Sequence, residues 1–177
     1  MIILGVDPGT ATTGYGLLAR DGQRVAAVGY GVVRTSSRDL PPVRLMRIYE
    51  RLCDLMDAHA PDVLVTERLF FGTNETTAIA VGRTIGVILL AAAQRGLPWV
   101  EYSPPVVKQA VVGYGGAEKR QVQYMIRQIL GLSEIPRPDD AADALAVAIC
   151  HAHTMPPERH SAHRTGAPVR APEEGKR

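Results

Sequence analysis

Two short apolar segments that each end in a carboxylate constrain the fold of this chain more than any other feature of its sequence. The first runs from Ile2 to Asp7 and the second from Asp62 to Glu67. Short apolar runs bounded by turn residues are typical of buried strands. Between them, after Pro41-Pro42, apolar residues keep helical spacing from Leu45 as far as His59, and a helical crossover of this kind joins parallel strands. The sequence therefore predicts two parallel strands that bring Asp7 and Glu67 to the same edge of a sheet.

The remaining elements complete an α/β fold, a mixed five-stranded sheet flanked by helices. Asp21-Gly22 favours a hairpin between strands over 14–20 and 23–34. A fifth strand is predicted over 99–102, a short helix around Lys108, and longer helices over 76–94, 118–130 and 140–151. The helix over 76–94 carries almost no charge, so we expect it to be buried on all sides.

Composition excludes several classes of protein. No segment approaches the ~18 apolar residues that span a bilayer, and the N-terminus reaches Asp7 before a signal-peptide core is complete. We therefore expect a soluble, intracellular protein with no membrane partner. Cys53 and Cys150 are too few for a disulfide scaffold or a cysteine zinc site, and are expected to be buried thiols.

Charge is nearly balanced, with 20 basic and 18 acidic residues in the whole chain. Five of the basic and three of the acidic residues belong to residues 154–177, so the first 153 residues are neutral in total. Total charge therefore does not by itself predict a nucleic-acid partner. Residues 154–177 are rich in Pro and Arg and poor in aliphatic side chains, which predicts a disordered tail after a single domain over 1–153.

Three further carboxylates crowd the start of the last predicted helix, at Asp139, Asp140 and Asp143. Asp139 is expected to cap that helix, and acids near its positive end are favourable. Asp143 lies inside an Ala-Leu-rich stretch, where Asp is a weak helix former, and its spacing from Asp140 projects both acids to one side. For each acid taken alone, a solvated strand-end or helix-start residue is the alternative.

Four carboxylates brought together would repel one another unless a divalent cation neutralised them. Ligand sets made of oxygen suit Mg²⁺ or Mn²⁺. The matching chemistry is two-metal phosphodiester hydrolysis, in which ions ~4 Å apart lower the pKa of the attacking water and stabilise the leaving oxygen. No nucleophilic side chain is then required.

Several motifs of the chain resemble those of the RuvC family of Holliday-junction resolvases. They are I-L-G-V-D-P-G-T (3–10), T-G-Y-G (13–16), T-E-R-L-F-F (66–71), V-K-Q-A-V-V-G (107–113), A-E-K-R-Q-V-Q (117–123) and D-A-A-D-A-L-A-V-A-I (140–149). The resemblance covers residues 1 to about 153. It implies a ribonuclease H-like fold and a metal-dependent endonuclease that resolves four-way DNA junctions by paired symmetric nicks in recombination and repair.

The resemblance also implies a site, a cofactor and partners. By motif, the catalytic metal ligands are Asp7, Glu67, Asp140 and Asp143, which would hold two Mg²⁺ ions, with Mn²⁺ as the alternative. Asp139 lies beside the motif. The implied partners are four-way junction DNA, a second copy of the chain in a homodimer, and the RuvA–RuvB branch-migration complex of a bacterial cytoplasm.

Three residues are candidates for DNA binding. Phe70 and Phe71 are the only phenylalanines, and an aromatic side chain just after Glu67 is placed to wedge between unstacked bases. The resemblance assigns the wedge to Phe70, and core packing is the alternative. Lys108 and Lys119 match family lysines that contact phosphate near the cut, whereas taken singly they read as solvated surface lysines.

Two other classes of protein are alternatives to a nuclease. A sugar-kinase or actin-like ATPase also begins with a strand and Asp-x-Gly-Thr, but that fold needs a second lobe for which 177 residues leave no room. A junction-binding module without catalysis needs no set of metal acids and leaves Asp143 unexplained.

Ala78, Gly82 and Gly86 form a smooth helical stripe that suits either a second copy of the chain or packing on its own sheet.

Overall fold

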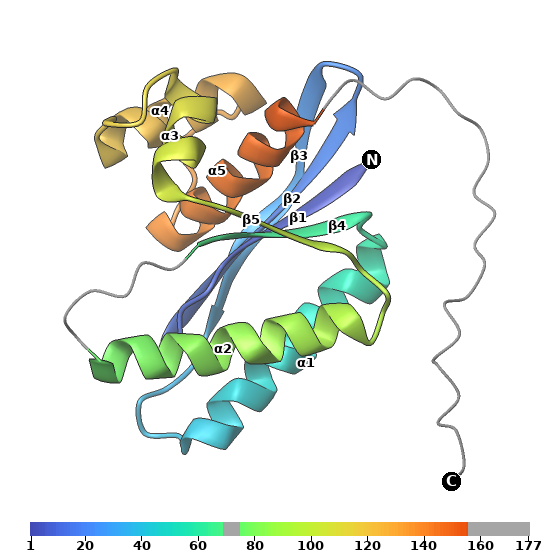
Figure 1. Ribbon diagram of the computed structural model, residues 1–177, viewed down its shortest axis with the longest axis vertical. Helices are drawn as coiled ribbons and strands as arrows, with labels where there is room; N and C mark the ends of the chain where they lie inside the picture. The colour runs from blue at the N-terminus through green and yellow to red at the C-terminus, as the bar shows by residue number, and fades with distance from the viewer. Residues whose placement is uncertain (69–74, 156–177) are drawn as a thin grey trace, which may run out of the picture.

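The computed structural model describes residues 1–68 and 75–155, without the side chains of residues 75–77 (Figure 1). Five strands form one sheet in the order β3-β2-β1-β4-β5. Their bounds are β1 Ile2–Asp7, β2 Thr12–Asp21, β3 Arg24–Arg34, β4 Val63–Glu67 and β5 Trp99–Tyr102. β1, β4 and β5 are parallel, whereas β2 runs antiparallel to β1 and β3. The predicted mixed five-stranded sheet is confirmed.

Helices cover both faces of the sheet. Their bounds are α1 Pro41–His59, α2 Glu75–Ala93, α3 Pro104–Val112, α4 Lys119–Leu130 and α5 Asp139–Thr154. α1 and α2 lie on one face, and α3, α4 and α5 lie on the other (Figure 1). Because neighbouring side chains of a strand point to opposite faces, Ile3 joins the core under α5 while Leu4 joins the core under α1 and α2. The sheet is the middle layer of three.

α2 differs from the sequence prediction, because it is not buried on all sides. The side chains of Ile79 and Leu90 are 57% and 53% exposed, and a Cβ added at Gly82 or Gly86 would meet no atom within 4 Å. Ile88 is fully buried on the other side of the helix. An apolar composition allows a helix to be buried but does not require it. A helix that lies on one face of a sheet is covered on one side only.

Glycines in β1 and β2 let α5 lie directly against the sheet. A Cβ at Gly5 would collide with the carbonyl oxygen of Ala144, and a Cβ at Gly14 would collide with that of Asp140. Gly14 is the register partner of Asp7, the last residue of β1. The close approach therefore brings the first turns of α5 next to the end of β1.

Two smaller expectations can also be compared with the structure. Cys53 and Cys150 are free and buried, as predicted. No helix among the described residues is both long and apolar enough to cross a bilayer. α5 continues to Thr154, and residues 156–177 of the predicted tail lie outside the described residues.

Candidate active site

The carboxyl ends of β1 and β4 place two of the predicted acids side by side. Val6 is the register partner of Thr66 on the parallel strand, so Asp7 and Glu67 are the next residues at one edge of the sheet. Burial raises the pKa of Glu67, repulsion from Asp143 adds to the rise, and attraction to Lys108 opposes it. Both strand-end acids therefore lie in a partly desolvated, negatively charged environment.

Asp7 is the most perturbed of the described carboxyl groups. Burial and repulsion from three neighbouring carboxylates, those of Asp143, Asp140 and Glu67, raise its pKa from 3.8 to about 7. Burial also raises the pKa of Asp143, against the attraction of Lys119. The structure thus brings Glu67 of β4 and Asp140 and Asp143 of α5 close enough to act on the charge of Asp7 at the end of β1.

Lys119, at the start of α4, reaches across to this group of acids. Its Nζ lies 2.9 Å from Oδ2 of Asp143 and 3.3 Å from Oδ2 of Asp139. Asp139 also accepts a hydrogen bond of 3.0 Å from Nε2 of Gln123. The prediction that Asp139 caps α5 is wrong: Pro138 is the N-cap residue, and Asp139 is the first residue of the helix. Its side chain turns to α4 instead.

A cavity of about 260 Å³ opens beside these acids. Glu67 and Asp143 line it together with Lys108 and Lys119, the two lysines that the sequence singled out. Apolar walls come from Pro104, Val107, Val122 and Ala146. A negative group entering this cavity would therefore meet two ammonium groups next to the acids.

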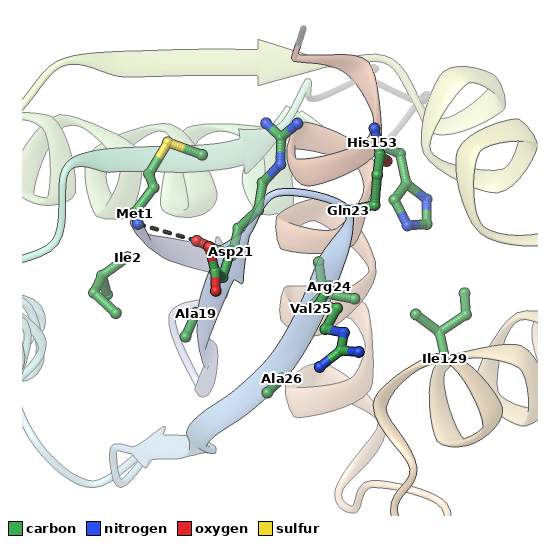
Figure 2. A pocket seen from close by; sticks show the side chains of 11 residues that line it. Met1, Ile2, Ala19, Asp21, Gln23, Arg24, Val25, Ala26, Ile129 and His153 are labelled. Carbon is green, nitrogen blue, oxygen red and sulfur yellow. Dashed lines mark hydrogen bonds between the residues drawn. The ribbon is translucent and has the colours of Figure 1, made fainter. Parts of the chain in front are cut away.

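A roomier hollow of about 590 Å³ lies at the other end of β1 (Figure 2). Met1, Asp21, Arg24 and His153 are among the residues around it. The α-amino group of Met1 donates a hydrogen bond of 3.1 Å to the carbonyl of Arg20. None of the four predicted catalytic acids lines this hollow, so size does not identify the site of chemistry.

The acids fit a hard divalent cation by their chemistry, because carboxylates supply only oxygen ligands. Within residues 1–68 and 75–155, no three His, Cys, Asp or Glu side chains are drawn together tightly enough to hold an ion as they stand. The ammonium of Lys119 occupies one oxygen of Asp143, and the carboxylates of Asp143, Asp140 and Glu67 repel that of Asp7. A bound cation would reverse that repulsion.

The structure also shows what the sequence prediction missed. Arg44 and residues 9–12 line a groove next to Asp140, although Arg44 belongs to none of the motifs. No local signal identifies Arg44, because its position depends on how α1 packs beside the β1–β2 turn. Phe70 and Phe71, the former a predicted DNA-binding residue, lie outside the described residues.

Comparison with known proteins gives the same family that the motifs resemble. The family model described as "Crossover junction endodeoxyribonuclease RuvC" matches residues 3–151. The RuvC of Syntrophomonas wolfei is 54% identical over 154 residues, which are 87% of this chain and 90% of that protein.

Two solved structures of Thermus thermophilus RuvC are also similar, both at 38% identity. One has a TM-score of 0.81 and covers 86% of this chain and 94% of its own. The other, in complex with a Holliday junction substrate, has a TM-score of 0.83 and covers 86% of this chain and 93% of its own.

Proposed function

The chain belongs to the RuvC family of crossover junction endodeoxyribonucleases, and from this membership we propose that Asp7, Glu67, Asp140 and Asp143 are its catalytic metal ligands. It is an endonuclease that resolves Holliday junctions in recombination and repair. Metal dependence follows from the family, and the proposal specifies two Mg²⁺ ions, with Mn²⁺ as the alternative. When bound, such ions lower the pKa of an attacking water and stabilise the leaving oxygen.

The observation that carries this proposal is the charge at the end of β1. Asp7 lies in a partly buried position where three other carboxylates repel it, which raises its pKa to about 7. Carboxyl groups with strongly perturbed pKa values cluster at functional sites. Acid clusters that offer only oxygen ligands suit divalent metal ions. In this proposal the phosphodiester that is cut lies next to the four acids.

The lysines position the substrate in this proposal. Lys108 and Lys119 line the cavity shared with Glu67 and Asp143, so both can neutralise a phosphate that enters it. The ammonium group of Lys119 lies 2.9 Å from Oδ2 of Asp143 and would exchange that carboxylate for the phosphate as its partner. Phe70, three residues after Glu67, is proposed to wedge between bases at the branch point.

Assembly completes the proposal. A four-way junction is close to two-fold symmetric, so a homodimer would present two identical sites to opposing strands and make paired nicks. The exposed face of α2, with Ile79, Gly82, Gly86 and Leu90, supports its use as the contact between copies. Family membership supports a bacterial cytoplasmic setting and cooperation with the RuvA–RuvB branch-migration complex.

The test is a nicking assay on a mobile synthetic four-way junction, with and without Mg²⁺, beside linear duplex of the same sequence. We expect metal-dependent cuts in the junction and little cutting of the duplex. Asp7→Asn, Glu67→Gln, Asp140→Asn and Asp143→Asn should each abolish cutting and leave junction binding largely intact, because the acids hold metal and not phosphate.

Asp139→Asn is the matched control, since this acid neighbours the others but pairs with Lys119 and Gln123. We expect it to keep cutting. Robust cutting by any of the four variants would remove that residue from the site, and equal cutting of linear duplex would contradict junction selectivity.

A further inference from the structure

A second groove, of about 490 Å³, lies beside the proposed metal acids. Its walls come from four elements of the fold: the turn over 9–12 between β1 and β2, Arg44 of α1, Ala80 and Val81 of α2, and Asp140 of α5. Among these lining residues Arg44 is the one cation and Asp140 the one anion. The groove is therefore a place where a positively charged side chain lies next to the reaction centre.

Arg44 is anchored in this groove by one nitrogen. Its Nε donates a hydrogen bond of 2.8 Å to Oγ1 of Thr35, whose hydroxyl donates to the carbonyl of Thr10 at 2.6 Å. The hydroxyl of Thr10 in turn donates to the carbonyl of Ala80 at 3.0 Å. The Nη1 and Nη2 groups of Arg44 have no hydrogen bond or ion pair with any residue that the structure describes. They remain available to a ligand.

The turn beside Arg44 offers backbone donors as well. The carbonyls of Gly9, Thr10 and Ala11 accept hydrogen bonds from Thr13 Oγ1, Thr35 Oγ1 and the Thr35 N–H respectively. The N–H groups of the same three turn residues donate to no acceptor in residues 1–68 and 75–155. Successive unpaired N–H groups in a turn favour an anion.

We propose that this groove binds a backbone phosphate of the DNA strand, next to the phosphodiester that is cut, with Arg44 as its charged ligand. The inference rests on the proposed function, because Asp140 belongs to the proposed metal site. Asp140 alone would repel an anion in the groove. Metal at the acids removes that repulsion, so the groove and the reaction centre are filled together by adjacent positions of one strand.

The first test is the salt dependence of junction binding, measured in Ca²⁺ under conditions that give no cutting. Losing one phosphate contact reduces the slope of log K against log salt by ~0.9. For Arg44→Gln we therefore expect the ratio of variant to wild-type Kd to fall by about threefold between 50 and 200 mM salt. If Arg44→Gln lowers the Tm, it is replaced by Arg44→Met, which keeps the aliphatic stem of the side chain.

Arg47→Gln is the matched control. Arg47 belongs to the same helix and carries the same charge, but it pairs with Asp39 at 3.2 Å, is 51% exposed and does not line the groove. We expect the wild-type salt slope for this variant. Equal slopes for the Arg44 and Arg47 variants would overturn the proposal.

The second test locates the phosphate. Junctions carrying one neutral methylphosphonate linkage at each position within three nucleotides of the cut are compared by Kd. We expect one position at which the neutral linkage weakens junction binding by the wild type but does not further weaken binding by the Arg44 variant. If no position behaves in this way, the groove does not bind backbone phosphate. Both tests measure binding only, so a wild type that fails to nick junctions would contradict the proposed function separately.

Discussion

Asp7 has the most strongly perturbed carboxyl group of the proposed site. Its carboxylate is partly buried and repelled by Asp143, Asp140 and Glu67. At pH 8, above its raised pKa of about 7, the group is charged in the folded protein and lowers the free energy of unfolding relative to an unperturbed Asp. The charge that serves metal binding therefore costs stability when no metal is bound.

We predict that Asp7→Asn stabilises the metal-free protein at pH 8 by about 2 kcal/mol, or about 4–8 °C in Tm. Addition of Mn²⁺ should raise the Tm of the wild type and raise that of the variant much less. Thermal unfolding in EDTA and in excess metal measures both effects. A variant that melts below the wild type in EDTA would show that Asp7 is not in electrostatic conflict.

Gly14 is the residue on which the position of Asp140 depends. A Cβ there would collide with the carbonyl oxygen of Asp140, which is backbone and cannot rotate away. We predict that Gly14→Ala displaces the first turn of α5, lowers Tm by several degrees and reduces nicking by at least tenfold.

Gly29→Ala is the control for this prediction, because a Cβ at Gly29 would meet no atom within 4 Å. It should leave both the Tm and the nicking rate close to those of the wild type. Unimpaired nicking by Gly14→Ala would mean that α5 tolerates displacement at its start.

At the scale of elements, α5 is tied to the edge of the sheet by a buried histidine. Nδ1 of His151 lies 2.9 Å from the hydroxyl of Tyr102 at the end of β5, with the two rings edge to face. Burial lowers the pKa of His151 below its ordinary value of 6.5, and the nearby charge of Arg20 lowers it further. The folded protein therefore binds the His151 proton less tightly than the unfolded chain does.

This shift predicts the sign of a pH dependence. Because the unfolded state binds more protons here, the contribution of His151 to stability is complete above about pH 6.5 and is lost as pH falls below it, by at most ~1.4 kcal/mol per pH unit. The difference in urea unfolding free energy between wild type and His151→Gln, measured from pH 5 to 8 in EDTA, should show this slope.

Tyr102→Phe is the companion variant, since it removes the hydroxyl partner but leaves His151 buried. It should retain the pH dependence, because burial is the larger cause of the lowered pKa. A difference between wild type and His151→Gln that does not change with pH would contradict the assignment.

For the whole molecule, the exposed apolar face of α2 is where a second copy is proposed to bind. Ile79 and Leu90 are exposed there, and no atom lies within 4 Å of a Cβ built at Gly82 or Gly86. We predict that Gly82→Leu and Gly86→Leu raise the dimer Kd by tenfold or more and convert paired nicks into single nicks. Both changes improve helix propensity, so unfolding of the protomer is not expected.

Light scattering over a range of protein concentrations, together with the ratio of doubly to singly nicked junction, tests this prediction. Gly29→Leu on β3 introduces the same side chain at another open position and serves as the control. Paired nicks by a variant that is monomeric in light scattering would separate assembly from function.

Local patterns in the chain were enough to predict the helices and strands, the parallel pair β1 and β4, and the edge of the sheet where Asp7 and Glu67 meet. These features follow from local periodicity and turn residues, which act over short stretches of chain. The motifs also sufficed to indicate the family, because they recur in order along the first 153 residues.

Which sides of these elements are covered, and which distant groups meet, depends on packing in three dimensions. α2 has an exposed face because a helix on a sheet is covered from one side, although its composition allows full burial. Asp139 pairs with Lys119 instead of capping α5, and Arg44 reaches the groove beside Asp140. These contacts join residues far apart in the chain, and their geometry arises from packing between layers, which no local pattern encodes.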